Sequence, residues 1–342
     1  MRVIQVGCGL ISGRWLDAIR AHGDLEPVAL VDVDQDAARE AAASRGFDVP
    51  IFADAHDALA NVAADVVFDC TPPKVHRDVT LAALGAGRHV FGEKPMAEEM
   101  DEARAMVDAA HASGKTYAVM QNRRFDPNIR ALRAFIESGA IGRLTTVDAE
   151  FYISPHFGGF RETMNHVLLL DMAIHTFDAA RFLTGANAEA VYCHEWNPRG
   201  SWYAHGASAS AIFEMTDGIV FNYLGSWCAE GLHTAWEGSW RLIGERGSIT
   251  WDGATGLRCQ VVEGSGAFIN NQVDIPGPKL VEGEPDTWHD RAIRDFVDKI
   301  SRSATPETVC DDNIHSLAMV LGAIESSKRG ARVASPLMET TT

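Results

Sequence analysis

Residues 88–95 read Arg-His-Val-Phe-Gly-Glu-Lys-Pro, and this stretch organises the rest of the chain. Its first half is a short apolar run, long enough for one buried strand. Pro95 cannot donate a hydrogen bond to a sheet, so we expect the strand to end just before it. Ligands of open parallel sheets bind beyond the carboxyl ends of the strands, which would place Lys94 over a bound ligand. Taken alone, a lysine at such a place is more simply a surface residue in a turn.

Composition predicts an ordinary soluble protein of two domains. The chain has 342 residues, 46% hydrophobic and 23% charged, which is long for a single core. Its formal net charge of -17 argues against nucleic acid and anionic membrane surfaces as partners. The six cysteines lack the spacing of a metal site or a disulfide framework. No signal peptide or transmembrane segment is evident, so we expect a cytoplasmic protein without a metal.

A dinucleotide-binding pattern opens the chain. We expect a strand at 2–6, a glycine turn at 7–13, a helix at 12–22 and a strand at 27–31 that ends at Asp32. Gly7 permits the tight turn, and Gly9 lets the backbone approach a pyrophosphate at the helix N-terminus. The third position of the fingerprint is Ser12 rather than glycine.

Asp32 favours NAD over NADP. Its carboxylate would accept hydrogen bonds from both ribose hydroxyls and would repel a 2′-phosphate. Val33 and Asp34 follow it, so no arginine is adjacent to bind that phosphate. Asp34 itself is more simply a helix cap or a solvated surface residue.

Helices and strands alternate up to residue 121. The expected helices are 36–46, 55–62, 75–86 and 98–113, and the expected strands are 65–70, 88–92 and 116–120. This alternation predicts a doubly wound parallel sheet in a domain over residues 1–121. His76 lies one turn after Thr71-Pro72-Pro73, near the expected nicotinamide. It would either cap the helix or contact the cofactor.

The pattern changes in residues 122–342, which form the expected second domain. We expect helices at 127–138, 286–303 and 311–329, strands at 143–153, 188–196, 207–216, 218–228, 239–244, 247–251 and 257–263, and a frayed end at 338–342. Short turns such as Thr216-Asp217-Gly218-Ile219 predict antiparallel pairing. An open sheet with aromatic content needs its second face covered, and we expect a second subunit to cover it.

One expected helix, residues 168–183, carries polar groups among apolar ones. Helical spacing puts Asp171 and His175 on one face, one turn apart. Asp178 and Arg181 have the spacing of a local ion pair. A buried carboxylate and imidazole need partners or a function, so the pair would either tie the helix into the core or act chemically. No third ligand is apparent for a metal.

Three motifs together resemble the glucose–fructose oxidoreductase / inositol dehydrogenase / MocA (Gfo/Idh/MocA) family over nearly the whole chain. They are Cys70-Thr71-Pro72-Pro73, Glu93-Lys94-Pro95 and Asp171-x-x-x-His175, and they follow the glycine turn. The resemblance implies a Rossmann domain joined to an α/β domain with an open, mostly antiparallel sheet. It also implies oxidation or reduction of one carbon of a sugar, cyclitol or polyol with NAD or NADP.

The resemblance further implies a site. Lys94, Asp171 and His175 would be the catalytic residues, the Lys94–Pro95 peptide would be cis, and the sheets would pair in homodimers or homotetramers. The expected cofactor-binding residues are Gly7, Gly9, Leu10, Ile11, Asp32, Thr71, Pro72, His76, Glu93, Lys94 and Gln121.

The substrate contacts are less well defined. Many family members carry a glycine cluster where this chain has Asn165-His166-Val167, so substrate identity cannot be carried over. The candidate contacts are Asn122, Arg123, Arg161 and His166. As alternatives, the two arginines would form surface pairs and Asn122 would be a turn residue. Core or interface packing is favoured over sugar stacking for Trp202, Trp227 and Trp236.

The predicted reaction is NAD-dependent dehydrogenation of a secondary hydroxyl on a sugar, inositol or related polyol. His175 would act as general base, Lys94 would stabilise the developing charge on the oxygen, and Asp171 would orient the substrate or His175. Lys94 as the proton carrier remains open. The alternatives are an NAD-retaining epimerase, lyase or glycosidase, or a non-enzymatic NAD-sensing regulator.

Overall fold

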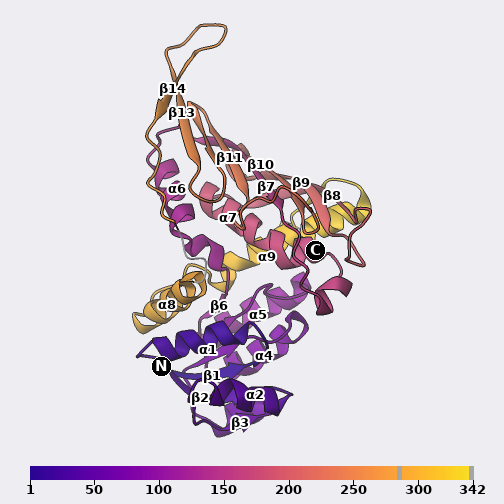
Figure 1. Ribbon diagram of the computed structural model, residues 1–342. Coiled ribbons are helices and arrows are strands. Elements are labelled where there is room, and N and C mark those ends of the chain that lie inside the picture. Colours follow the sequence, from indigo (N-terminus) through magenta and orange to yellow (C-terminus); the bar gives the residue numbers. More distant parts are fainter. Residues whose placement is uncertain (283–286, 339–342) are drawn as a thin grey trace. The chain divides into compact units, whose positions relative to one another are not determined.

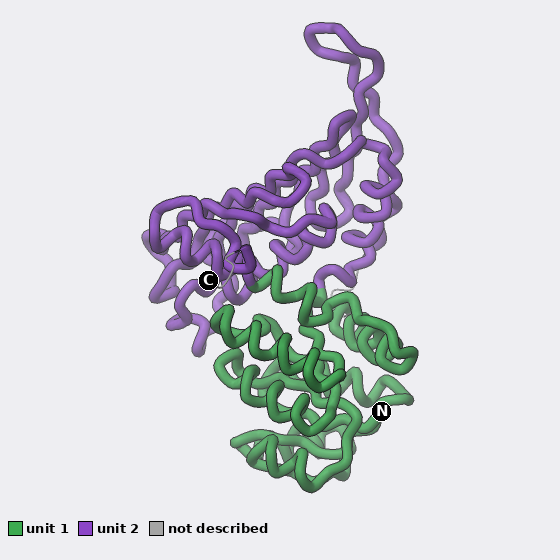
Figure 2. Tube along the Cα trace, turned by 180° about the vertical axis from the view of Figure 1, so that it is seen from behind, with its two compact units in different colours: residues 1–122, 286–317 green, residues 123–285, 318–342 purple. Residues whose placement is uncertain are grey.

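The computed structural model describes residues 1–282 and 287–338, and the chain forms two compact units (Figure 1, Figure 2). Unit 1 comprises residues 1–122 and 286–317, and unit 2 comprises residues 123–285 and 318–342. The predicted division after residue 121 lies within one residue of the division observed here, but the prediction assigned 286–317 to the second domain. Asp286, the expected start of a helix, and residues 339–342 of the expected frayed end lie outside the described residues.

Unit 1 contains a six-stranded parallel sheet in the order β3-β2-β1-β4-β5-β6. Its strands are β1 (Arg2–Val6), β2 (Glu26–Val31), β3 (Ile51–Phe52), β4 (Val66–Asp69), β5 (His89–Gly92) and β6 (Tyr117–Val119). The connecting helices are α1 (Ser12–Ala21), α2 (Gln35–Ala43), α3 (Ala55–Asn61), α4 (Pro73–Gly85) and α5 (Met100–Ser113). This strand order is that of a doubly wound dinucleotide-binding sheet, which confirms the predicted Rossmann domain. The short β3 was not expected.

An aromatic cluster explains why a C-terminal segment packs in unit 1. Trp15 on α1 lies with its ring 5.1 Å from that of Phe68 and 5.0 Å from that of Phe91. Phe296, on helix α8 (Thr287–Ser301), stacks on Phe91 with ring centroids 4.6 Å apart. Helix α8 therefore buries its apolar side in the same core as α1, where stacked aromatic pairs add to the burial of their surface.

Unit 2 contains a nine-stranded sheet in the order β14-β13-β12-β11-β7-β10-β9-β8-β15. Its strands are β7 (Leu144–Tyr152), β8 (Ala188–Trp196), β9 (Ser208–Met215), β10 (Val220–Ser226), β11 (Ser239–Gly244), β12 (Gly247–Trp251), β13 (Leu257–Glu263), β14 (Asn271–Ile275) and β15 (Val333–Ala334). Neighbours pair antiparallel except for β7 and β10, which are parallel. The mostly antiparallel sheet is confirmed, whereas β14 and β15 were not expected.

The turn between β9 and β10 is the predicted one. Asp217 and Gly218 have φ of 61° and 71°. Two successive left-handed residues are typical of the type I′ turn, whose twist suits an antiparallel hairpin. The flanking residues Glu214 and Val220 pair across it.

The two faces of this sheet differ. Strand β9 alternates buried and exposed residues along most of its length, and its buried side faces a core shared with helices α6 (Pro127–Glu137), α7 (Ile174–Thr184) and α9 (Cys310–Arg329). Phe177 of α7 meets Phe213 and Tyr223 edge-on in that core. The other face exposes Tyr192 and Ile212, at 48% and 47%, and these two residues are cross-strand neighbours.

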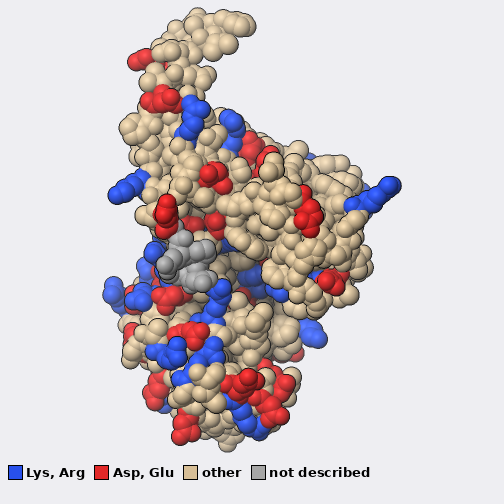
Figure 3. Space-filling model, in the orientation of Figure 1, with Lys and Arg blue, Asp and Glu red and all other residues tan. Residues whose placement is uncertain are grey.

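The hairpin of β13 and β14 ends in an uncharged tip. Residues 264–273 contain no Asp, Glu, Lys or Arg, and Phe268 is fully exposed. Figure 3 shows this tip without charge, while acidic and basic side chains are interspersed over the rest of the visible face.

The expected single α-helix over residues 168–183 is wrong in its first part. Leu168–Ala173 form a π-helix, and α7 begins only at Ile174. A π-helical segment is rare in proteins and is frequently found at functional sites. Asp171 lies within the π-helix and His175 in the first turn of α7.

Candidate active site

The glycine turn after β1 lies against the end of β4. Gly7 has φ of 86°, and a Cβ atom there would come within 2.6 Å of the carbonyl of Cys70, so only glycine fits. At Gly9, by contrast, a Cβ would meet nothing within 4 Å, which leaves room for a ligand to approach the backbone. Leu10 is 99% exposed beside it, and Ile11 precedes α1 as its N-cap residue.

Asp32 at the end of β2 is tied to this turn. Its two carboxylate oxygens accept hydrogen bonds from the backbone N–H groups of Cys8, at 2.7 Å, and Asp34, at 2.8 Å. The side chain of Asp34 accepts from the N–H groups of Asp36 and Ala37 and so caps α2, as predicted. Burial raises the pKa of Cys8 to about 12, so this thiol adds no negative charge where a pyrophosphate would lie.

A buried carboxylate organises the turn after β4. Asp69 Oδ1 accepts from the backbone N–H of Thr71 at 3.0 Å and from its hydroxyl at 2.6 Å. Burial raises the pKa of Asp69 above its ordinary value, and the nearby charge of His76 opposes that rise. Pro72 is the N-cap residue of α4, so Thr71 and Pro72 lie at the edge where a parallel sheet binds ligands.

Glu93 and Lys94 follow β5 at the same edge. The Glu93 carboxylate points inward, accepting from Trp15 Nε1 at 2.8 Å and from the Lys94 N–H at 3.2 Å. The Lys94–Pro95 peptide is cis, as the resemblance implied. Lys94 is half-buried between buried neighbours. Trp15 was missed in the sequence, because nothing in a local pattern links it to a residue 78 positions away.

His76 does not cap α4, and its expected contact with the cofactor stays a prediction. It lies inside α4 with 2% of its surface exposed. Nδ1 is 2.9 Å from the carbonyl oxygen of Pro95, and Nε2 is 2.7 Å from that of Thr71. The ring therefore binds backbone on both sides.

Gln121 and Asn122 lie beyond β6 and are bound within unit 1. The Gln121 side chain is fully buried and accepts from Asn313 Nδ2 at 3.3 Å. Asn122 Nδ2 lies 3.2 Å from His289 Nδ1. Both partners come from the C-terminal segment that packs in unit 1.

In unit 2, Asp171 is held by an arginine. Arg161 Nε and Nη2 donate to the two carboxylate oxygens of Asp171 at 2.7 and 3.3 Å. The guanidinium also lies 5.0 Å from the ring of Phe157 and 4.8 Å from that of Phe160, contacts that favour a cation. His175, with 9% of its surface exposed, follows on α7.

His166 occupies a strained backbone position. Its φ is 55°, in the left-handed region that favours glycine. Its Nδ1 pairs with the Glu195 carboxylate. This contact holds His166 in a conformation that is costly for a residue other than glycine.

Arg123 forms a buried ion pair with Glu237, whereas the alternative to a substrate contact was a surface pair. It donates to Glu237 at 3.1 Å and to the Trp236 carbonyl, and 9% of its surface is exposed. Burial lowers the pKa of Arg123 and raises that of Glu237, while each charge opposes the shift of the other. Arg123 Nη2 also lies 3.7 Å from Met172 Sδ, so this pair supports the π-helix beside Asp171.

Two further findings concern the ion pairs of Asp178 and the packing of the tryptophans. Asp178 pairs with Arg181 as predicted, and Arg124, which the sequence did not indicate, forms a second, bidentate pair with this fully buried carboxylate. Arg181 is the more distant partner, at 3.6 Å. The Trp227 ring packs on Phe151 and Trp236, and Trp202 stacks on His156 at 3.8 Å, which agrees with the favoured packing role.

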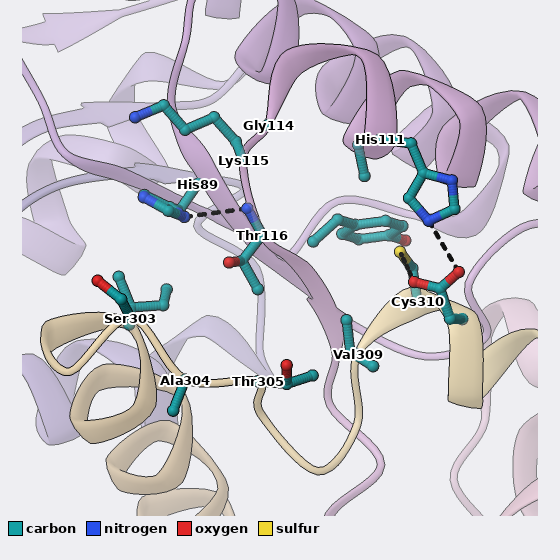
Figure 4. Close-up of a pocket in the computed structure, with 14 residues that line it drawn as sticks. His89, His111, Gly114, Lys115, Thr116, Ser303, Ala304, Thr305, Val309 and Cys310 are labelled. Carbon is teal, nitrogen blue, oxygen red and sulfur yellow. Dashed lines mark hydrogen bonds and ion pairs between the residues drawn. The ribbon is translucent and has the colours of Figure 1, made fainter.

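A cavity of about 420 Å³ lies elsewhere in unit 1 (Figure 4). His89 and Thr116, at the amino ends of β5 and β6, line it together with the start of α9. Thr116 donates its N–H to His89 Nδ1 at 3.0 Å, and His111 pairs with Asp311 at 2.8 Å. Parallel sheets bind ligands at their carboxyl edge, so this cavity is at the wrong edge for the cofactor.

Two absences apply to the described part of the chain only. Within residues 1–282 and 287–338, no helix has the length and apolarity to span a membrane. In the same ranges, no three His, Cys, Asp or Glu side chains gather where a metal could bind. The six cysteines are all free thiols.

The strand order, the glycine turn and Asp32 define unit 1 as a dinucleotide-binding domain, joined to an α/β unit with an open sheet. Family models match both halves: "Oxidoreductase family, NAD-binding Rossmann fold" over residues 1–121 and "GFO/IDH/MocA C-terminal domain" over residues 129–250. The chain belongs to the Gfo/Idh/MocA family of NAD-binding oxidoreductases.

Relatives and solved structures agree with this membership. The chain is 26% identical to a 1,5-anhydro-D-fructose reductase of Ensifer adhaerens, over 95% of this chain and 96% of that one. It is 31% identical to an inositol 2-dehydrogenase of Rhizobium meliloti, over 54% and 56%. Its fold is similar to that of an oxidoreductase from Agrobacterium radiobacter solved with NAD+, L-tartaric acid and magnesium, with a TM-score of 0.87, 21% identity and 99% coverage of both chains.

Proposed function

We propose that this protein is an NAD-dependent dehydrogenase that oxidises a secondary hydroxyl of a sugar, inositol or related polyol. The observation that carries the proposal is the cofactor edge of unit 1, where the open space at Gly9, the paired Asp32 and the half-buried Lys94 lie on one sheet. Relatives named as a sugar-derivative reductase and an inositol dehydrogenase support the substrate class.

The residues present fit NAD. Gly7, Gly9, Leu10 and Ile11 form the turn before α1, whose N-terminus favours a pyrophosphate. Asp32 keeps lone pairs for the ribose hydroxyls and carries the charge that disfavours NADP. In addition, Thr71, Pro72, His76, Glu93, Lys94 and Gln121 are proposed to lie at or beneath the nicotinamide end. When bound, NAD would accept a hydride from the alcohol carbon.

Lys94 and His175 are proposed to meet at the reacting hydroxyl. His175 takes its proton, since an imidazole titrates in the range where such a base works. Lys94 donates a hydrogen bond to the same oxygen and stabilises its negative charge. Asp171, fixed by Arg161, keeps the local charge balanced. Asn122, Arg123, Arg161 and His166 remain proposed neighbours of the substrate. Arg123 would act through the π-helix, since its guanidinium is bound to Glu237.

The test is a screen of the purified protein against monosaccharides and inositols with NAD and NADP, read as absorbance of the reduced cofactor. We expect turnover with NAD, and a kcat lowered about 10²–10⁴-fold by His175→Ala and by Lys94→Ala. Near-normal turnover of His175→Ala with an unchanged acidic limb of the pH–rate profile would contradict its role as base. Substrate conversion without net reduced cofactor would instead support an NAD-retaining epimerase, lyase or glycosidase. NAD binding without any conversion would support a regulator.

Assembly and location follow as lesser proposals. The exposed apolar residues of the open sheet face support a homodimer or homotetramer formed through that face. The free thiols are consistent with the cytoplasm.

A further inference from the structure

His76 joins two turns that belong to neighbouring strands. Thr71 lies in the turn after β4 and Pro95 in the turn after β5, and the two strands pair in parallel. The imidazole ring lies between their carbonyl oxygens, with N···O distances of 2.7 and 2.9 Å. With 2% of its surface exposed, the ring is sealed from solvent. It therefore links the two turns at the carboxyl edge of the sheet.

The chemistry of the ring suits two acceptors. Both contacts are carbonyl oxygens, which only accept, and a neutral imidazole carries a single N–H. Each contact is a hydrogen bond when the ring nitrogen that faces the carbonyl carries a proton. A glutamine carries both donor hydrogens on one nitrogen and has an acceptor oxygen beside it, so it cannot replace donors at the two separate ring positions.

The contact of His76 with the Pro95 carbonyl lies next to Lys94 in the chain. Lys94 is flanked by Glu93, whose carboxylate accepts the Lys94 N–H at 3.2 Å, and by Pro95, whose carbonyl binds His76. The backbone on both sides of Lys94 is thus anchored to buried side chains. A rigid support of this kind sets the position of a charged group to within the tolerance that transition-state stabilisation requires.

We propose that His76 is a positioning residue that holds the Lys94–Pro95 turn at the site, rather than a helix cap or a cofactor contact. This inference rests on the proposed function of Lys94. It predicts that the loss of His76 acts on turnover through Lys94 and leaves binding of NAD almost unchanged.

The kinetic test compares His76→Gln with Val79→Ala. Val79 lies on the same helix, is 6% exposed and touches neither carbonyl bond, so its truncation is matched for lost packing. We expect His76→Gln to lower kcat at least about 10-fold with KM for NAD and substrate changed less than about 3-fold, and Val79→Ala to leave kcat near normal. In the Lys94→Ala background, adding His76→Gln should change kcat less than about 2-fold, because coupled residues are not additive. An equal loss in both backgrounds, or an equal loss in Val79→Ala, would overturn the proposal.

A second readout needs no turnover and so separates this inference from the proposed function. Lysines are reductively methylated with ¹³C-formaldehyde, and the Lys94 signal is identified by its absence in Lys94→Arg. We expect this methyl signal to shift or broaden in His76→Gln and to stay in place in Val79→Ala. An unchanged Lys94 signal in His76→Gln would overturn the inference even if the enzyme proves active. A shifted signal in a protein without dehydrogenase activity would contradict the proposed function and leave the inference standing.

Discussion

At the scale of single residues, Asp69 links stability to pH. Its side chain is fully buried, and Oδ2 has no hydrogen-bond partner among the described residues. Burial raises the pKa of Asp69 above 3.8, so the folded state holds its proton more tightly than the unfolded state. Below 3.8 both states are protonated and nothing is lost. As the pH rises from there through the raised folded pKa, the unfolded state ionises first and the protein loses stability.

The corresponding prediction concerns Asp69→Asn, which cannot ionise and keeps an acceptor for Thr71. As the pH increases from about 4, the Tm of the wild type should fall relative to that of Asp69→Asn. This change should level off above the raised pKa of Asp69. Calorimetry across pH 4 to 8 measures it. Asp36→Asn, at an exposed position, controls for the loss of one charge. A difference that stays constant with pH would contradict the assignment.

At the scale of elements, helix α7 is held by an ion pair from the segment after β6. Arg124 donates from Nε to Asp178 at 2.9 Å, and a second bond joins Nη2 to the other oxygen. Arg124 is 5% exposed and Asp178 fully buried. Removing one partner of such a pair leaves an uncompensated buried charge.

We therefore expect Arg124→Met to lower the free energy of unfolding by about 3 kcal/mol, at the lower end of the range for broken buried pairs because Arg181 remains near Asp178. Arg39→Met, which breaks an exposed pair with Asp36, should cost about 0–1 kcal/mol. Urea unfolding followed by tryptophan fluorescence reports mainly unit 2, which holds six of the eight tryptophans, namely Trp196, Trp202, Trp227, Trp236, Trp240 and Trp251. Equal losses in the two variants would contradict the role given to Arg124.

At the scale of the whole molecule, the open sheet is the surface to test. Tyr192, Ile212 and Asn222 lie side by side on β8, β9 and β10, and the first two are about half exposed. We expect the wild type to sediment at two or four times the chain mass of 37.1 kDa. Ile212→Arg should shift it toward the monomer, because a charge at the centre of a buried interface has no partner. Val33→Arg, on unit 1 and 91% exposed, is the control, and a monomeric wild type at micromolar concentration would refute the assembly.

The sequence by itself determined the two kinds of sheet and the dinucleotide-binding fold of unit 1. Strand, glycine turn, helix and acid follow one another within Arg2–Asp32, and such local patterns of apolar spacing and turn chemistry survive whatever packs around them. The Asp217-Gly218 hairpin and the cap at Asp34 were predictable for the same reason.

Only the tertiary structure decided which distant groups meet. The stacking of Phe296 on Phe91 puts α8 into unit 1. Arg124 adds a bidentate pair to Asp178, which also pairs with Arg181 as predicted. His76 contacts two carbonyl oxygens instead of capping its helix. The π-helix at Asp171 was likewise not predicted from the sequence. A local pattern shows only whether a side chain is apolar, charged or able to donate a hydrogen bond. The partner of that side chain comes from a distant part of the chain. It is selected on folding, because a buried charge or hydrogen-bonding group without a partner costs free energy.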